Sequence, residues 1–256
     1  MKMLVLCLDN SFGPWHEMYQ EGTLKTWCGP SNPQIFCRRF MGQDSTCPIL
    51  NRIANRLLVS RSLYKYWHLL QSKKELKKVQ VQEVNGVIRV DLPELWSNIT
   101  LKTLAAMKFA LDNFEFDFLL RANSTCYLDL ASLQHYLSKN AESTLYAGPI
   151  AKGKEFVSGW GILLSRESVE VLVNSYTRAD QQYFDDEAVG KVLKRMKITP
   201  QELPFIEIFS NRDLDQISSE EMRKTPFFRM KFTQNGNRKD DVLMRALHER
   251  VMSQAK

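Results

Sequence analysis

A neutral polar triplet, Asn123-Ser124-Thr125, directly follows the aromatic-rich segment 114–120, which we expect to be a buried strand. Open α/β sheets bind ligands at the carboxyl ends of their strands. The amide and hydroxyl groups of the triplet can donate hydrogen bonds to a polar ligand and accept them from it. The sequence therefore places a candidate ligand site at the end of this strand.

Two glycines flank a tryptophan in the segment 156–165, which reads as another strand. Glycine inside a strand indicates a bulge or a close approach by a ligand or by backbone, so Gly159 and Gly161 mark a place where a ligand fits. An aromatic face such as that of Trp160 can stack on a sugar ring. Trp160 is equally compatible with a place in the core.

Acidic residues stand at two other boundaries between elements. Asp9 and Asn10 follow the first strand, where open α/β sheets commonly build ligand sites. Asp185 and Asp186 precede a helix that we expect over residues 187–196. At the start of a helix, acidic side chains cap the backbone and favour its dipole, which is the structural alternative to a role in chemistry.

The segment 225–239 is basic and aromatic, and it contains Arg229, Lys231, Arg238 and Lys239. Arginine presents a planar fork of N–H donors that matches the oxygens of a phosphate group. The segment therefore suits a phosphorylated ligand. The alternative for Arg229 and Lys231 is an edge strand that carries solvated charges.

The elements that must position these residues alternate between strands and helices. Asn85-Gly86 predicts a hairpin turn between two short strands. We expect strands at 1–8, 79–84, 87–90, 114–120, 144–148 and 156–165, and helices at 49–70, 100–113, 130–139, 166–176, 187–196 and 240–252. No repeat or linker divides the chain, so we expect one α/β domain over 1–256, with a mixed central sheet flanked by helices.

The composition is that of a folded protein, because 44% of the 256 residues are hydrophobic and 25% are charged. The formal net charge of +6 suits anionic partners. The densest basic run, 73–78, lacks the interleaved aromatic residues of a single-strand nucleic-acid platform, and we expect it to be a solvated helix end. We therefore expect no nucleic-acid partner, whereas peripheral contact with an anionic membrane face agrees with the charge.

The five cysteines include no CxxC pair, which argues against a zinc ribbon and against a disulfide framework, so we expect reduced thiols. No stretch reaches the roughly 20 apolar residues of a membrane-spanning helix, and the apolar run at the N-terminus is too short for a signal peptide. These features predict a cytoplasmic protein.

The segment 91–103, D-L-P-E-L-W-S-N-I-T-L-K-T, resembles the segment D-F-x-D-x-Y-x-N-L-T-L-K-T of the inverting beta-1,3-glycosyltransferase family that includes Fringe and the beta-1,3-galactosyltransferases. Residues 119–130 align without a gap with that family's L-L-K-T-D-D-D-V-F-V-N-L. Residues 145–148, 158–166 and 185–190 are similar to its L-Y-A-G, S-G-G-G-Y-V-L-S-R and D-D-x-x-V-G segments. The resemblance covers about residues 88–198, and the C-terminal basic segment and helix at 225–256 lie outside it.

This resemblance implies a GT-A-like domain with a Rossmann-like mixed sheet, a nucleotide-sugar donor and a glycan or glycolipid acceptor. It places Asp186 at the position of the general base, with Asp185 as a helper. Lys102 and Arg121 fall in matched segments and are expected at the nucleotide or diphosphate, together with Asp9 and Asn10. The alternative for Lys102 is a solvent-facing helix lysine. The acceptor sugars are expected at Gly159, Trp160 and Gly161.

The resemblance also implies that Asn123-Ser124-Thr125 stands where the family has the D-x-D residues that hold a divalent metal. Neutral side chains do not compensate a hard cation. We therefore favour a metal-independent enzyme that requires no cofactor, in which the Arg and Lys residues of 225–239 neutralise the diphosphate. The alternative is Mn²⁺ or Mg²⁺ held mainly by the diphosphate, with Asn123 or Asp129 completing the shell.

The function expected from these features is inverting transfer of a sugar onto a glycan hydroxyl in surface polysaccharide or glycan synthesis. A catalytically inactive GT-A-like module that binds glycan or nucleotide is the alternative, because the acidic triplet is lost.

Overall fold

The computed structural model describes residues 1–10, 13–29, 33–43, 74–140 and 142–254. The helix expected at 49–70 lies outside these residues. Within them, the central sheet has eight strands in the order β3-β4-β2-β1-β5-β8-β7-β9. The bounds are β1 Met3–Leu8, β2 Ile35–Gln43, β3 Val81–Val84, β4 Val87–Pro93, β5 Phe118–Asn123, β7 Tyr146–Gly148, β8 Gly161–Ser165 and β9 Gln201–Glu202.

The central sheet is mixed, as the sequence predicted. Strand β1 is parallel to both β2 and β5, whereas β8 is antiparallel to β5 and β3 is antiparallel to β4. The β3–β4 hairpin turns at Asn85 (φ 53°) and Gly86 (φ 75°), the positive values that such a tight turn requires. The α/β fold class is therefore confirmed.

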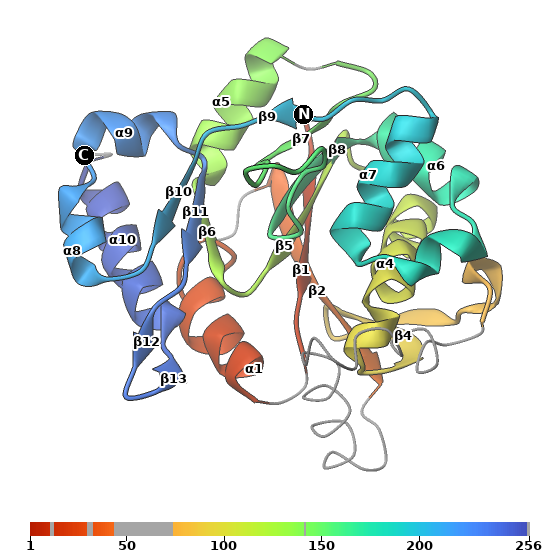
Figure 1. The fold of residues 1–256 in the computed structure, drawn as a ribbon, viewed down its shortest axis with the longest axis horizontal. Helices are drawn as coiled ribbons and strands as arrows, with labels where there is room; N and C mark the ends of the chain where they lie inside the picture. The colour runs from red at the N-terminus through yellow and green to blue at the C-terminus, as the bar shows by residue number, and fades with distance from the viewer. Residues whose placement is uncertain (11–12, 30–32, 44–73, 141, 255–256) are drawn as a thin grey trace.

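Helices cover both faces of the sheet (Figure 1). The helices α4 Ile99–Asn113, α6 Arg166–Ser175 and α7 Asp185–Arg195 pack against one another. Along β1, side chains alternate between two hydrophobic cores, with Val5 in one and Leu4 in the other. The opposite side holds α1 Pro14–Met18, α5 Leu130–Asn140 and α10 Asp240–Gln254. Among the described helices, none is long and apolar enough to cross a bilayer.

A second sheet, in the order β10-β11-β6, stands beside the first (Figure 1). Its strands are β10 Phe205–Ile208, β11 Phe227–Met230 and β6 Cys126–Leu128. Strand β11 is the middle strand, parallel to β10 and antiparallel to β6. The alternative of an edge strand for Arg229 was therefore wrong, because neighbours pair with both edges of β11.

Short elements complete the described chain. They are η1 Tyr19–Thr23, η3 Leu76–Lys78, η4 Trp96–Asn98, η5 Arg178–Gln182, α8 Asn211–Gln216, α9 Ser219–Lys224, β12 Thr233–Gln234 and β13 Asn237–Arg238. The described cysteines, Cys7, Cys28, Cys37 and Cys126, are free thiols.

Two predicted strands differ from the observed ones. The strand predicted at 114–120 begins at Phe118 and continues through Asn123, so Asn123 is the last strand residue and the turn follows it. The strand predicted at 156–165 is confined to Gly161–Ser165. Gly159 and Trp160 form a turn ahead of it, closed by a hydrogen bond from Gly161 N to Ser158 O (3.1 Å).

Candidate active site

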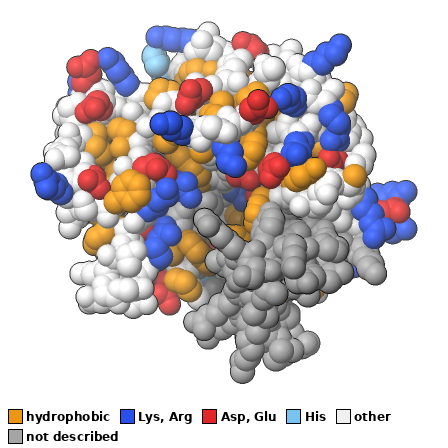
Figure 2. All heavy atoms as spheres, viewed as in Figure 1, with side chains coloured by type: hydrophobic (Ala, Val, Ile, Leu, Met, Phe, Trp, Pro, Cys, Tyr) orange, Lys and Arg blue, Asp and Glu red, His pale blue; other side chains and the backbone are white. Residues whose placement is uncertain are grey.

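A cavity of about 360 Å³ lies at the carboxyl ends of β1 and β5. Its lining includes residues from the start of α7 and from β11 of the small sheet, elements that lie on either side of β1 and β5 in Figure 1. In Figure 2, Lys and Arg side chains gather beside hydrophobic ones near the middle of this face. The predicted site residues that line the cavity are Asp9, Asn10, Arg121, Asn123, Ser124, Thr125, Gly159, Trp160, Asp185, Asp186, Arg229 and Arg238.

Asp186 lies in the first turn of α7 and faces the cavity. Phe184 is the N-cap residue and its side chain caps no backbone group, while Asp185 and Asp186 are acidic residues of the first turn, so the alternative that they favour the helix dipole stands beside a role in chemistry. Asp186 Oδ2 accepts a hydrogen bond from Gly159 N (3.0 Å), and Oδ1 accepts one from Glu187 N (2.8 Å). Burial and the charge of Asp185 raise the pKa of Asp186. A carboxylate with a raised pKa in a cavity is suited to accept a proton.

Asp185 is held from below by Arg121 of β5. Arg121 Nη2 lies 2.5 Å from Asp185 Oδ2, which also accepts a hydrogen bond from Thr103 Oγ1 (3.1 Å). Both charged side chains are at least 95% buried. The Nε atom of Arg121 is buried and has no hydrogen-bond partner in the described part of the chain. The Asp185 charge is therefore fixed beside Asp186, where it helps to raise the pKa of that carboxyl.

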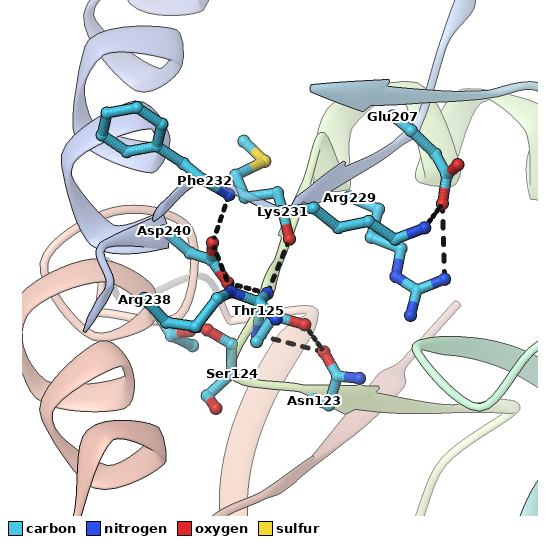
Figure 3. Close-up of polar contacts among 11 residues, drawn as sticks. Asn123, Ser124, Thr125, Glu207, Arg229, Lys231, Phe232, Arg238 and Asp240 are labelled. Atoms are coloured by element: carbon cyan, nitrogen blue, oxygen red, sulfur yellow. Dashed lines mark hydrogen bonds and ion pairs between the residues drawn. The ribbon is translucent and has the colours of Figure 1, made fainter. Parts of the chain in front are cut away.

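Asn123 closes a turn at the end of β5. Its Oδ1 accepts hydrogen bonds from Thr125 N (3.0 Å) and from Thr125 Oγ1 (2.7 Å) (Figure 3). These two bonds use both lone pairs of the oxygen, which leaves the amide nitrogen as a donor. Ser124 is buried beside it, and its backbone oxygen accepts a hydrogen bond from Thr23.

The donor set at this turn does not fit a divalent metal. The oxygen that would bind the ion is occupied by Thr125, and the triplet has no carboxylate. Asp129, the other ligand considered, instead accepts hydrogen bonds from Ala131 N and Ser132 N at the start of α5 and lies outside the cavity lining. No group of three or more His, Cys, Asp or Glu residues suited to a metal occurs among the residues that the structure describes.

Three basic residues of the C-terminal segment, Arg229, Lys231 and Arg238, have carboxylate partners. Glu207 Oε1 lies 3.3 Å from Arg229 Nη1 and 2.7 Å from Lys231 Nζ (Figure 3). Arg238 pairs with Asp240, and its Nη2 donates to Met230 O (3.1 Å). Of the three cations, Arg229 and Arg238 line the cavity, whereas Lys231 does not.

Lys102 lies away from the cavity lining, in contrast to both alternatives drawn from the sequence. It is 2% exposed and forms an ion pair with Glu94, whose Oε2 accepts a hydrogen bond from Gly42 N. Almost every residue of α4 from Thr100 to Met107 is buried, so this helix has no solvent-facing side there. With its carboxamide turned to satisfy its hydrogen bonds, Asn10 donates to Glu94 Oε1 (3.0 Å) and connects this pair to the cavity.

The glycine–tryptophan segment has mixed roles. Trp160 is 4% exposed and packs edge-on against Phe205 and Phe227, so most of it belongs to the core. Gly161 faces the core as well, because a Cβ there would lie 2.6 Å from the Phe227 ring. The expected sugar contact at Gly161 therefore has a packing explanation, whereas Gly159 lines the cavity and binds Asp186.

Asp9 is buried at the cavity edge beneath two basic side chains. Its Oδ2 lies 3.1 Å from His16 Nδ1 and 3.5 Å from Arg39 Nη1, and its Oδ1 accepts a hydrogen bond from Asn10 N (2.8 Å). Burial raises the pKa of Asp9 to about 6, against the opposing effect of these partners. Asp9 therefore titrates near neutral pH.

An aromatic wall that the sequence reasoning missed lies beside Asp186. Trp96 is 40% exposed and contacts Phe184 edge-to-face, with the ring centroids 5.8 Å apart. Both residues line the cavity, as does Ile99. Trp96 falls in the segment 91–103, opposite a family tyrosine, and that match was the available signal.

A sequence model of the family described as "Galactosyltransferase" matches residues 69–155. This segment contains Arg121 and Asn123 and ends before Asp186. A search of curated proteins finds no significant match.

Solved glycosyltransferases are similar to the chain at low identity. One is the galactosyltransferase LgtC, in complex with donor and acceptor sugar analogs (9% identity, 97% of this chain and 96% of that chain, TM-score 0.48). Another is a glycosyltransferase involved in the glycosylation of the major capsid of PBCV-1 (10%, 96% and 100%, 0.48). A third is the glycosyltransferase GlyE in Streptococcus pneumoniae (10%, 99% and 65%, 0.45). The family-model match supports the prediction, made from the sequence, of a glycosyltransferase.

Proposed function

We propose that this protein is an inverting glycosyltransferase that moves a sugar from a nucleotide-sugar donor to a hydroxyl of a glycan or glycolipid acceptor. The observation that carries the proposal is Asp186, a half-buried carboxylate with a raised pKa that faces a cavity at the ends of parallel strands. The match of residues 69–155 to the galactosyltransferase family supports it. It also makes galactose the first donor sugar to test.

The proposed reaction takes place in this cavity. Asp186 takes the proton of the acceptor hydroxyl, and the oxygen attacks the anomeric carbon of the donor sugar. The bond from that carbon to the diphosphate oxygen breaks, and the nucleoside diphosphate leaves with the electron pair. Asp186 of α7 and Arg229 of β11 both line the cavity, which would let the base and the cation act on different groups of the bound donor and acceptor.

The acceptor is expected on the Asp186 side, because the base must lie within hydrogen-bond reach of the attacked hydroxyl. Trp96 and Phe184, which pack edge-to-face and both line the cavity, offer apolar surface for the C–H face of a sugar ring. Surface polysaccharide or glycan synthesis in the cytoplasm remains the proposed setting. The net charge of +6 supports peripheral contact with an anionic membrane.

The test compares wild type with Asp186→Asn on a panel of nucleotide sugars, beginning with UDP-galactose, with glycan and glycolipid acceptors. We expect wild type to form a product of inverted anomeric configuration, and Asp186→Asn to lose about 10²–10⁴-fold in kcat while it keeps donor affinity. Donor binding without turnover in wild type would contradict the proposal and indicate an inactive binding module instead. Full activity of Asp186→Asn would remove Asp186 as the base.

A further inference from the structure

We propose that Arg229 and the Asn123 carboxamide form a metal-free diphosphate site, and that Arg229 binds this ligand by exchanging Glu207 for a phosphate oxygen. The identity of the ligand as a nucleoside diphosphate rests on the proposed function. The site itself rests on the placement, hydrogen bonding and charge of residues of the Asn123 turn and the small sheet.

Strand pairing brings the two residues together although more than a hundred positions separate them in sequence. The chain leaves β5 at Asn123, turns, and enters β6, which pairs with β11 so that Arg229 lies opposite Cys126. A hydrogen bond from Met230 N to Thr125 O (3.0 Å) fixes the two segments at the turn itself. Arg229 and Asn123 consequently line one cavity.

Asn123 is oriented as a donor. Because Thr125 N is an obligatory donor, the atom that it contacts must be the amide oxygen, which settles the orientation of the carboxamide. The amide nitrogen points away from Thr125 in Figure 3. A donor at this point attracts an anion, whereas an aspartate in its place would repel one unless a cation lay between them.

The surrounding charges favour an anion at Arg229. Among the described residues, Arg238 pairs with the carboxylate of Asp240, whereas Arg229 and Lys231 share one carboxylate, that of Glu207. The Glu207 group therefore carries one net positive charge at the edge of the cavity. A diphosphate entering the cavity meets that charge.

The distances indicate which partner Glu207 keeps when the ligand binds. Glu207 Oε1 lies 2.7 Å from Lys231 Nζ but 3.3 Å from Arg229 Nη1. The guanidinium has five N–H donors and uses one of them in this contact. Arg229 can thus turn toward a phosphate while Glu207 stays neutralised by Lys231, so the exchange leaves no carboxylate unpaired.

The experiment measures binding of inorganic pyrophosphate, UDP, GDP and uridine by titration calorimetry, with EDTA present throughout. Pyrophosphate removes any dependence on the nucleobase, and uridine removes the phosphates. The variants are Arg229→Gln and Glu207→Gln, with Arg223→Gln on the exposed surface of α9 as the matched control.

Wild type is expected to bind pyrophosphate and at least one nucleoside diphosphate in EDTA. Arg229→Gln should weaken that binding about 10- to 100-fold and leave any uridine binding unchanged. Glu207→Gln should strengthen it about 3-fold, because the competing carboxylate is gone. A purely structural Arg229–Glu207 pair predicts the same sign of change for both variants, and that result would overturn the proposal.

The failure of this site is distinguishable from the failure of the proposed function. A chain that transfers sugar only with Mn²⁺ and binds no pyrophosphate or nucleoside diphosphate in EDTA keeps the function and overturns the metal-free site. A chain that binds these ligands in EDTA, with the opposite effects of the two variants, supports the site even if no sugar is transferred.

Discussion

Arg121 and Asp185 form a buried ion pair directly beneath the first turn of α7, with Nη2 of the arginine 2.5 Å from Oδ2 of the aspartate. One residue comes from the middle of the sheet and the other from the helix that carries Asp186. The pair therefore fixes the turn that carries Asp186 to the sheet.

Removing one partner of this pair should destabilise the fold. Arg121→Met leaves the Asp185 carboxylate buried and uncompensated, so we expect the free energy of unfolding to fall by about 3–5 kcal/mol. The double variant Arg121→Met, Asp185→Asn should lose less than the two single variants together. Urea unfolding of all four proteins gives the coupling energy, and strict additivity would show that the pair is not coupled.

The same pair should set the pH dependence of activity. A base must be ionised, so kcat/KM should fall as the pH drops through the raised pKa of Asp186. Asp185→Asn removes a charge that raises this pKa, so the acidic limb of the pH profile of kcat/KM should move to lower pH. Arg121→Lys keeps the positive charge, so its limb should stay near that of wild type. If kcat/KM fell at the same acidic pH in wild type and in Asp185→Asn, Asp185 would have no effect on the pKa of Asp186.

Lys102 should contribute to the stability of the fold and not to the affinity for a diphosphate. Lys102→Met leaves the buried Glu94 unpaired, which should cost about 3–5 kcal/mol, while pyrophosphate affinity changes less than about 3-fold. Lys108→Met in the same helix breaks an exposed pair with Asp112 and should cost at most about 1 kcal/mol. If the Lys102→Met protein were as stable as wild type but did not bind pyrophosphate, that result would show that Lys102 binds the ligand.

Asp9 should make stability depend on pH near 6. Its carboxyl has a folded-state pKa of about 6, above the ordinary value of 3.8, so folding favours the protonated form. Its stabilising contribution is complete below pH 3.8 and is lost as the pH rises through 6. At pH 8, Asp9→Asn should therefore be more stable than wild type, by about 1–3 kcal/mol, and at pH 4 the difference should vanish. Unfolding curves across this range, with the exposed Asp112→Asn as control, measure the change.

Local patterns in the sequence predicted most elements because those elements have local causes. Ser165 caps α6 by accepting a hydrogen bond from Ser168 N, and Asn85-Gly86 turns the β3–β4 hairpin. The resemblance over 88–198 assigned Asp186 and Asn123 to one site, and both residues line the same cavity.

Long-range partners were beyond the reach of such patterns. Nothing near Arg229 in sequence identifies Glu207 as its counterion, since the contact depends on the pairing of β10 with β11. Lys102 was misplaced because α4 is buried around most of its circumference, and its apolar spacing does not reveal which side contains an ion pair. Trp96 was missed because exposure of an aromatic ring cannot be read from its neighbours in the chain.

The pairing of β6 with β11 can form only late in translation, because β11 follows β6 by about a hundred residues. Residues 1–198 contain Asp186, the Asn123 turn and the strand β6, but the strand β11 that pairs with β6 is complete only when residue 230 has emerged from the ribosome. Until then the nascent chain presents an open strand edge and half a cavity. Arg229 is thus translated after Asp186, so a product truncated before Phe227 would contain Asp186 without Arg229 and would expose β6 to aggregation.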